Sequence, residues 1–205
     1  MIVVVSYGSG NVRSVVKMYE RIGIPAVALA DPEAVAAAER LVLPGVGSFD
    51  SAAAKLRESG LEEPLTDAVV RRGVPVLGVC LGMQLFARRS AEGSAAGLGW
   101  LDADVARLDD SGDNHTALRL PHMGWAAVRP VTPNPLLPAR SPLERFYFVH
   151  TYHVCCADPG DVLGVATYGV EFTAAVHRDN IWGVQFHPEK SHRFGMDVLR
   201  RFAEI

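Results

Sequence analysis

Two patterns of hydrophobic and polar positions alternate along the first ninety residues. Short runs of consecutive apolar residues, typical of buried strands, are followed by segments in which apolar residues recur every three or four positions, as on one face of a helix. The predicted strands cover residues 2–6, 25–29, 40–43 and 75–79. The predicted helices begin near residues 12 and 50 and cover residues 33–39 and 61–72. This alternation predicts an α/β fold with a doubly wound, mostly parallel sheet and flanking helices.

The second half of the chain has a different pattern. A Gly/Ala/Ser loop, a polar turn and a proline-rich segment separate strand-like runs; these connections are residues 91–99, 109–114 and 132–142. The runs cover residues 104–108, 146–154, 162–167, 172–177 and 181–185. They predict an added antiparallel section, followed by a helix that begins near Ser191. We find neither an internal repeat nor a linker, so we expect one domain over residues 1–205.

Composition narrows the functional class. The chain has 205 residues, of which 49% are hydrophobic and 21% charged, as in a globular protein. Its net charge of -3 gives no electrostatic reason to expect nucleic acid or an acidic membrane as a partner. The apolar N-terminus lacks the basic flank of a signal peptide, and no apolar run is long enough to span a membrane. Three cysteines make no disulfide framework, so we expect a cytoplasmic protein.

Cys80 stands where a predicted strand meets a predicted helix. Gly78 and Gly82 flank it, each one residue away, which gives a thiol version of the G-x-S-x-G turn that presents a nucleophile. A helix start beside the sulfur would favour the thiolate, and the N–H of Leu81 would point to where an oxyanion forms. A lone cysteine after an apolar run is more often a small buried hydrophobe. The two glycines and the helix start favour a nucleophile instead.

His187 and Glu189 follow the last predicted strand. A thiol nucleophile needs a base, and the base needs a third group that fixes its tautomer, so these two side chains have the right chemistry. In a regular strand they would point to opposite faces, but Pro188 would end the strand. We therefore predict a kinked segment in which Glu189 reaches back to His187. Alone, the pair could equally be a surface histidine before a helix; with Cys80, a catalytic triad is favoured.

A second group of histidines and cysteines resembles a metal site at first. On a strand, His153 and Cys155 share one face, whereas His150 and Cys156 lie on the other. Zinc needs three or four ligands in one place. We therefore expect no metal site and no cofactor, and we expect the two adjacent cysteines to be core residues.

Several motifs together resemble the class I (triad) glutamine amidotransferases. Within that family the chain most resembles the glutaminase subunits of imidazole glycerol phosphate synthases, and order and spacing agree over essentially the whole chain. The motifs are residues 7–11 (YGSGN), 44–47 (PGVG), 78–84 (GVCLGMQ), 121–125 (PHMGW), 147–152 (YFVHTY) and 186–191 (FHPEKS). Two positions, Ser6 and Ala126, depart from the residues usual in the family.

The resemblance implies a role for each matching position. Cys80 would attack the side-chain amide of glutamine, with His187 as acid and base and Glu189 as its orienting group. Backbone groups would form the oxyanion hole and others would line the glutamine pocket. The oxyanion and substrate-binding candidates are Gly45, Val46, Gly47, Leu81, Gln84, His150, Thr151 and Tyr152.

The resemblance also implies a partner, a (β/α)8 barrel cyclase subunit that forms a heterodimer with this chain and receives its ammonia. That cyclase makes imidazole glycerol phosphate and an aminoimidazole-carboxamide ribonucleotide in histidine biosynthesis. Asn11, Trp125 and Lys190 are candidates for the contact face, although a helix cap, a core aromatic and a solvated charge are equally reasonable interpretations. The alternatives are a glutaminase of another pathway, a catalytically silent activator of the cyclase, and a cysteine hydrolase acting on another amide or ester.

Overall fold

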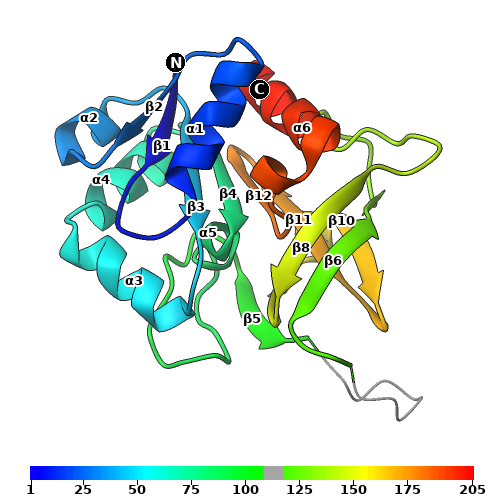
Figure 1. Ribbon diagram of the computed structural model, residues 1–205. Helices are drawn as coiled ribbons and strands as arrows, with labels where there is room; N and C mark the ends of the chain where they lie inside the picture. Colours follow the sequence, from blue (N-terminus) through cyan, green and yellow to red (C-terminus); the bar gives the residue numbers. More distant parts are fainter. Residues whose placement is uncertain (109–117) are drawn as a thin grey trace.

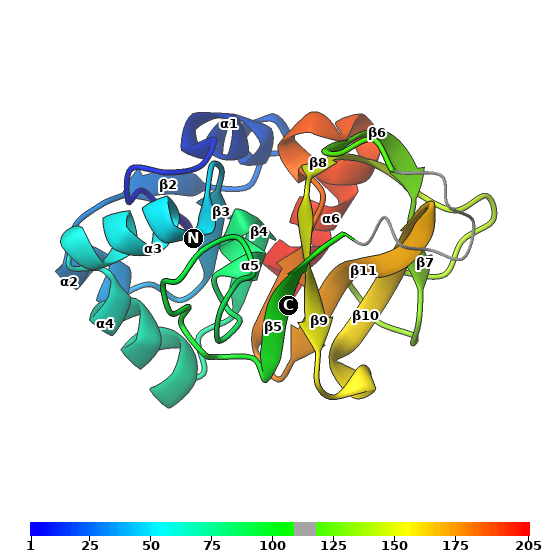
Figure 2. The same cartoon turned by 90° about the horizontal axis from the view of Figure 1, so that it is seen from below.

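A mostly parallel sheet forms the centre of the structure, a computed structural model that describes residues 1–108 and 118–205. In these residues the main sheet has eight strands in the order β2-β1-β3-β4-β12-β11-β10-β7 (Figure 1; β7 is labelled in Figure 2). The parallel strands are β1 (Ile2–Val5), β2 (Ala26–Leu29), β3 (Leu41–Gly45), β4 (Val76–Cys80) and β12 (Ile181–Val184). Four of these strands are buried on both faces, which explains their unbroken apolar runs.

Helices cover both faces of this sheet, as the alternating pattern predicts. Alternate residues of β1 point to opposite faces, so Ile2 and Val4 join one apolar cluster and Val3 and Val5 join the other. The first cluster packs against α1 (Val12–Arg21) and α6 (His192–Glu204). The second packs against α2 (Pro32–Ala36), α3 (Phe49–Glu58) and α4 (Glu62–Thr66), which continues into a π-helical turn (Asp67–Arg71). Figure 2 shows the two helical layers on opposite sides.

Antiparallel strands extend the sheet beyond β12. They are β11 (Val170–Arg178), β10 (Val162–Tyr168) and the short edge strand β7 (Arg129–Pro130). The fold class predicted from the sequence is therefore confirmed. Among the described residues, no helix combines the length and the apolar character needed to cross a membrane.

Two separate two-stranded ribbons lie beside the main sheet. One pairs β6 (His122–Ala127) with β8 (Arg145–His150), and the other pairs β5 (Ala103–Arg107) with β9 (Tyr152–Cys156). The single strand predicted over residues 146–154 is wrong, because the chain leaves one ribbon at His150 and enters the other at Tyr152. The strand β6 was not predicted, and the polar turn predicted at residues 109–114 lies outside the described residues.

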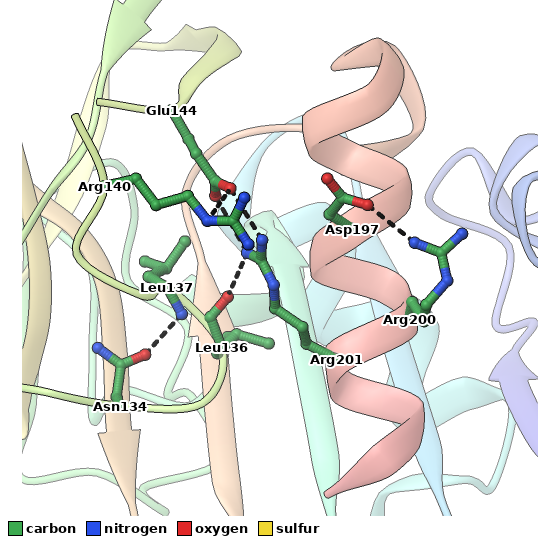
Figure 3. A network of polar contacts seen from close by, with 8 residues as sticks. All are labelled: Asn134, Leu136, Leu137, Arg140, Glu144, Asp197, Arg200 and Arg201. Atoms are coloured by element: carbon green, nitrogen blue, oxygen red, sulfur yellow. Dashed lines mark hydrogen bonds and ion pairs between the residues drawn. The ribbon is translucent and has the colours of Figure 1, made fainter. Parts of the chain in front are cut away.

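The proline-rich segment at residues 132–142 forms neither helix nor strand, as expected. It is attached to α6 by Arg201, whose guanidinium donates to the carbonyl of Leu136 and to both oxygens of Glu144 (Figure 3). Asn134 also folds the segment locally, because its side-chain oxygen accepts the N–H of Leu137 at 2.6 Å. Side-chain hydrogen bonds thus replace the backbone ladder that prolines would interrupt.

The carboxyl ends of the parallel strands meet at one edge of the sheet. The three glycine turns at residues 7–11, 44–47 and 78–82 follow β1, β3 and β4 and therefore lie at this edge, where open α/β sheets bind ligands. The ribbon strands β8 and β9 close the same edge from the other side, since His187 donates its N–H to the carbonyl of Tyr147 in β8. The fold thus brings residues from both halves of the chain to one place.

Candidate active site

Cys80 occupies a strained turn between β4 and the single helical turn α5 (Leu81–Gln84). Its φ of 55° and ψ of -113° lie where side chains are rarely found, which is the geometry predicted for a nucleophile turn. The flanking glycines are required. A Cβ at Gly82 would overlap the carbonyl of Leu43, and one at Gly78 would lie 2.6 Å from the ring of Phe86. Because α5 has only four residues, its dipole supports a thiolate less than a full helix would.

His187 and Glu189 form the kinked pair that the sequence predicts. The chain leaves β12, and a 3₁₀ turn (Pro188–Lys190) brings the carboxylate back so that Glu189 Oε1 lies 2.9 Å from His187 Nδ1. Both side chains are only 2% exposed. The turn is fixed by Ser191, whose hydroxyl donates to the carbonyl of His187 at 2.6 Å and accepts the N–H of Tyr147 at 3.0 Å. The imidazole is therefore held in one orientation.

The charges around His187 suit proton transfer. Burial by itself would lower the pKa of His187, but the hydrogen-bonding interactions with Cys80 and then with Glu189 outweigh it and raise the pKa to about 10. Since Nδ1 faces the carboxylate, it carries a proton and donates it to Glu189, which directs Nε2 toward the sulfur side. In the described residues, Nε2 makes no hydrogen bond of regular geometry, so it is free to exchange a proton with a ligand.

A pocket of about 560 Å³ opens at this edge and contains Cys80 and His187. Most of the predicted substrate residues line it: Val46, Gly47, Leu81, Gln84, His150, Thr151 and Tyr152. Gly45 lies behind the wall, paired with Cys80 in the sheet, where a Cβ would come within 2.6 Å of the N atom of Gly82. Glu189 lies behind His187. The structure thus gathers these candidates in or beside one pocket, and their roles remain predictions.

The backbone N–H of Val46 is engaged elsewhere in this structure. It donates to the hydroxyl of Ser9 at 3.1 Å, and that hydroxyl lies 2.8 Å from the carbonyl of Val46 as well. Gly47 follows with a φ of 95°, a value that favours glycine. The N–H of Leu81 opens the helical turn α5 and has no acceptor within it. An oxyanion hole using Val46 therefore requires the contact with Ser9 to break.

Gln84 lines the pocket, yet much of its amide is already used. Its Nε2 donates to the carbonyl of Tyr152 at 2.9 Å and to Oε1 of Gln185 at 3.0 Å. Both amide hydrogens therefore have protein acceptors, and only the carbonyl oxygen of Gln84 remains to meet a ligand.

Three further residues at the site were not found from the sequence. Glu92 lines the pocket, and its carboxylate accepts the N–H of Phe49 at 2.9 Å, at the start of α3. Ser9 holds Val46, and Gln185 contacts the sulfur of Cys80 at 3.6 Å. The register of β12 beside β4 could have pointed to Gln185, whereas Glu92 lies in an irregular loop that carries no periodic signal.

The three contact-face candidates lie near the pocket mouth or beside it. Asn11 and Lys190 line the pocket, and Asn11 precedes α1 without making a side-chain capping bond. Trp125 is 38% exposed and stacks on His192, so its interpretation as a core aromatic is wrong. Met123, two residues before it on β6, is 62% exposed, which extends the apolar surface.

The expectation that both adjacent cysteines are core residues is wrong for Cys155, which is exposed because β9 belongs to a two-stranded ribbon with one open face. Cys156 is partly buried and packs against the core. The sulfur of Cys155 lies 3.7 Å from Nε2 of His153, as their shared face predicts. Within the described residues, no group of three or more potential ligands gathers around a common point.

Comparison with known protein families shows which family the chain belongs to. Residues 3–205 match the family described as glutamine amidotransferase class-I. The chain belongs to the class I glutamine amidotransferases. Among curated relatives, imidazole glycerol phosphate synthase subunit HisH 2 of Pseudomonas aeruginosa is 48% identical over 205 residues, covering 100% of both chains. Subunit HisH of Bdellovibrio bacteriovorus is 44% identical, again covering 100% of both.

Solved structures share this amidotransferase fold at lower identity. A structure described as a glutamine amidotransferase superposes with a TM-score of 0.75 at 22% identity, covering 100% of this chain and 98% of that one. PurLQS from Thermotoga maritima superposes with a TM-score of 0.70 at 19% identity, covering 99% and 97%. At these identities the likeness concerns the fold alone.

Proposed function

We propose that the chain is the glutaminase subunit of an imidazole glycerol phosphate synthase. It hydrolyses glutamine to glutamate and ammonia and delivers the ammonia to a cyclase partner. The observation that carries the proposal is one pocket in which a strained cysteine faces an imidazole held by a buried carboxylate. The near-full-length similarity to proteins named HisH supports this pathway over other amidotransferase pathways.

The reaction begins with Cys80 and His187 as a thiolate and an imidazolium. The thiolate attacks the side-chain carbonyl carbon of glutamine, and a carbon–sulfur bond forms as the carbonyl oxygen becomes an oxyanion. His187 gives its Nε2 proton to the nitrogen, the carbon–nitrogen bond breaks, and ammonia leaves a glutamyl thioester. His187 then removes a proton from water, which attacks the thioester and releases glutamate and the thiolate. Glu189 stabilises the imidazolium in both steps.

The pocket wall offers partners for the amino-acid end of glutamine. Glu92 presents a carboxylate that would complement an α-ammonium group, and the free carbonyl oxygen of Gln84 would accept another of its hydrogens. The backbone at Thr151 and Tyr152 also lines the pocket. Leu81 and one of Val46 or Gly47 would supply the oxyanion donors, each worth roughly 3 kcal/mol. For Val46, this requires release from Ser9.

Ammonia must reach the partner without leaving the complex, because in neutral water it becomes ammonium and loses its nucleophilic lone pair. We therefore place the (β/α)8 barrel cyclase over the pocket mouth, so that the two chains form a heterodimer. Asn11 and Lys190 at the pocket rim, with the exposed Met123 and Trp125 on β6, form the proposed contact face. The partner would use the ammonia to make imidazole glycerol phosphate and aminoimidazole-carboxamide ribonucleotide.

A Cys80→Ala substitution tests the proposal in the complex with the barrel partner. We expect synthesis from glutamine to fall by roughly 10³-fold or more, while synthesis from added ammonium salts is retained. Glutamate release and imidazole glycerol phosphate formation are measured in parallel. Loss of both activities would mean that Cys80 serves docking. Absence of glutamate release by the unsubstituted complex with the partner's nucleotide present would favour a silent activator.

A further inference from the structure

Gln185 is a buried polar residue directly beside the nucleophile. It follows β12, whose Val184 pairs with Val79 of β4, so the register places Gln185 next to Cys80. Its side chain is fully buried, and its backbone N–H donates to the carbonyl of Ala174 at 2.8 Å. The amide Nε2 lies 3.6 Å from Cys80 Sγ with hydrogen-bond geometry. A buried amide is retained in a core only when its groups are paired, so this contact needs an explanation.

The neighbouring hydrogen bonds fix which end of the Gln185 amide faces the sulfur. The carbonyl of Tyr152 can only accept, so the atom of Gln84 that meets it at 2.9 Å must be nitrogen. The other hydrogen of that nitrogen points to Gln185 at 3.0 Å, so the atom that receives it must be oxygen. The remaining end of Gln185, the NH₂ group, therefore faces Cys80. A flipped amide would set two donors or two acceptors against each other.

The Tyr152 carbonyl that starts this chain of bonds is itself held by a second donor. His150 Nδ1 lies 3.0 Å from it, so this nitrogen carries the proton. His150 Nε2 then accepts from Nδ1 of His122 at 3.3 Å. Burial, which the bond to Tyr152 opposes, lowers the pKa of His150 to about 3, and burial also lowers the pKa of His122. Both rings are therefore neutral near neutral pH and keep these donor directions.

We propose that Gln185 is a positioning residue for the nucleophile, whose amide N–H stabilises the sulfur of Cys80 as a thiolate and holds it facing His187. The directed chain from Tyr152 through Gln84 presents this donor. The inference rests on the proposed role of Cys80 as nucleophile and adds a residue to it.

Other titratable groups face the sulfur from neighbouring elements. His187 approaches from the segment after β12 and carries Glu189 behind it, and Tyr7 approaches from the turn after β1. Burial raises the pKa of Tyr7 far above neutrality, so it stays neutral. His187 is then the one cation at the sulfur in the described residues, and Gln185 supplies a neutral donor that does not titrate. Removing a hydrogen bond to a charged group should change the thiolate population by roughly tenfold.

The test is the pH dependence of alkylation of Cys80 by iodoacetamide in the full chain, read from the Cys80 peptide by mass spectrometry. The variants are Gln185→Leu and Gln185→Met, which remove all polar atoms. Thr173→Val, a buried change on the neighbouring β11, is the matched control. Exposed Cys155 serves as an internal reference for reagent and pH. Only variants that retain cooperative unfolding are compared.

We expect the Gln185 variants to shift the midpoint of the Cys80 alkylation profile upward by about one pH unit and to slow alkylation near neutral pH by roughly tenfold. Thr173→Val and the Cys155 peptide should follow the unsubstituted chain. Coincident Cys80 profiles in any folded Gln185 variant lacking the donor, or an equal shift in Thr173→Val, would overturn the inference.

Glutamine kinetics in the complex give a second readout. We expect kcat to fall by roughly tenfold in Gln185→Leu with KM nearly unchanged, because the contact is to the sulfur and not to substrate. A change in KM alone would overturn a positioning role. The alkylation experiment needs no glutamine cleavage, so a shifted profile in a chain that releases no glutamate would sink the proposed function while leaving this inference standing.

Discussion

Two buried carboxylates, Glu144 and Glu189, differ in how completely their oxygens are paired by neighbouring side chains. Glu144 is 5% exposed, and both of its oxygens accept from the guanidinium of Arg201, at 2.8 and 3.0 Å, with Arg140 nearby (Figure 3). Glu189 is 2% exposed and meets His187 through one oxygen only. In the described residues its second oxygen and Nε2 of His187 make no hydrogen bond of regular geometry. In the Glu144 cluster both carboxylate oxygens have hydrogen-bond partners, whereas the Glu189–His187 cluster keeps polar atoms without one.

This difference separates a structural ion pair from a reactive one. Leaving a buried polar atom unpaired costs roughly 1–3 kcal/mol, so a cluster that only supports the fold should satisfy every atom, as Glu144 does. The open Nε2 of His187 lies in a pocket and faces the sulfur side, where a ligand can complete it. Tyr19 Oη and Trp182 Nε1 are also buried without a hydrogen bond in the described residues, so an unpaired atom alone does not identify a reactive group. What distinguishes His187 is that its open Nε2 belongs to a residue that lines the pocket with Cys80.

Glu189→Gln should produce the largest effect. Without the negative charge, the imidazolium loses its stabilisation and the tautomer of His187 is no longer enforced, so glutamine hydrolysis should fall by roughly 10³-fold. The measurement is glutamate release in the complex with the cyclase. Glu144→Gln is the matched control, since it neutralises a buried carboxylate away from the pocket and should leave kcat unchanged. Activity of Glu189→Gln within about threefold of the parent would contradict the triad.

Arg201→Met should have the largest effect on stability. It leaves the carboxylate of Glu144 buried with only Arg140 beside it, at 3.5 Å, so the free energy of unfolding should fall by about 3 kcal/mol. Urea unfolding measures this. The double change Glu144→Leu with Arg201→Met should recover part of the loss, because no unpaired charge remains.

The neighbouring Arg200 on α6 provides the control for Arg201. It pairs with Asp197 at 2.8 Å in an exposed position, so Arg200→Met should change the free energy of unfolding by less than about 0.5 kcal/mol (Figure 3). If Arg200→Met and Arg201→Met lowered the free energy of unfolding equally, the Glu144–Arg201 pair would stabilise the fold no more than a surface ion pair does.

The sequence predicts the parts of the site that local chemistry encodes. Two glycines around Cys80 leave few alternatives to a tight strand-to-helix turn, and Pro188 forces the chain out of the strand so that Glu189 can turn back to His187. The alternating apolar runs likewise suffice for the parallel sheet, because strands buried on both faces have little freedom in composition.

Features that depend on contacts between distant segments could not be predicted in this way. The break at Thr151 arises because β8 and β9 pair with different strands, and no glycine or proline marks it in the sequence. Cys155 is exposed because its ribbon has an open face, which a local pattern cannot indicate. Gln185 owes its orientation to a hydrogen-bond chain that begins at Tyr152.

A third kind of buried group, the neutral His150, should make stability depend on pH. Burial lowers its pKa to about 3, so the unfolded chain takes up a proton below the ordinary value of 6.5 while the folded chain does not. The contribution of the neutral His150 to the free energy of unfolding is fully present above about pH 6.5. It is lost as pH falls toward 3, by up to about 1.4 kcal/mol per pH unit. The raised pKa of His187 contributes with the opposite sign over this range, so urea unfolding at about pH 7.5 and about pH 5.5 is compared between the unsubstituted chain and a His150 variant.

His150→Gln separates this effect from lost packing. Its free energy of unfolding should be lower at both pH values, and the loss relative to the unsubstituted chain should be smaller by roughly 1 kcal/mol at about pH 5.5 than at about pH 7.5. His122, whose pKa burial also lowers, accounts for part of the pH dependence that remains. If the difference in the free energy of unfolding between the two pH values were the same with and without His150, then His150 would be protonated in the folded chain.

Ser9→Ala should have the smallest effect. It tests whether the N–H of Val46 becomes available as an oxyanion donor when its contact with Ser9 is removed. The hydroxyl now accepts the N–H of Val46, and its loss removes a competitor worth about 0.5–1.5 kcal/mol, so the isolated chain should hydrolyse glutamine roughly threefold faster. Ser48→Ala, at the neighbouring start of α3 where the side chain makes no capping bond, should leave the rate unchanged. An unchanged or lower rate in a Ser9→Ala chain of unaltered stability would mean that Val46 is not an oxyanion donor and that Gly47 and Leu81 supply the hole.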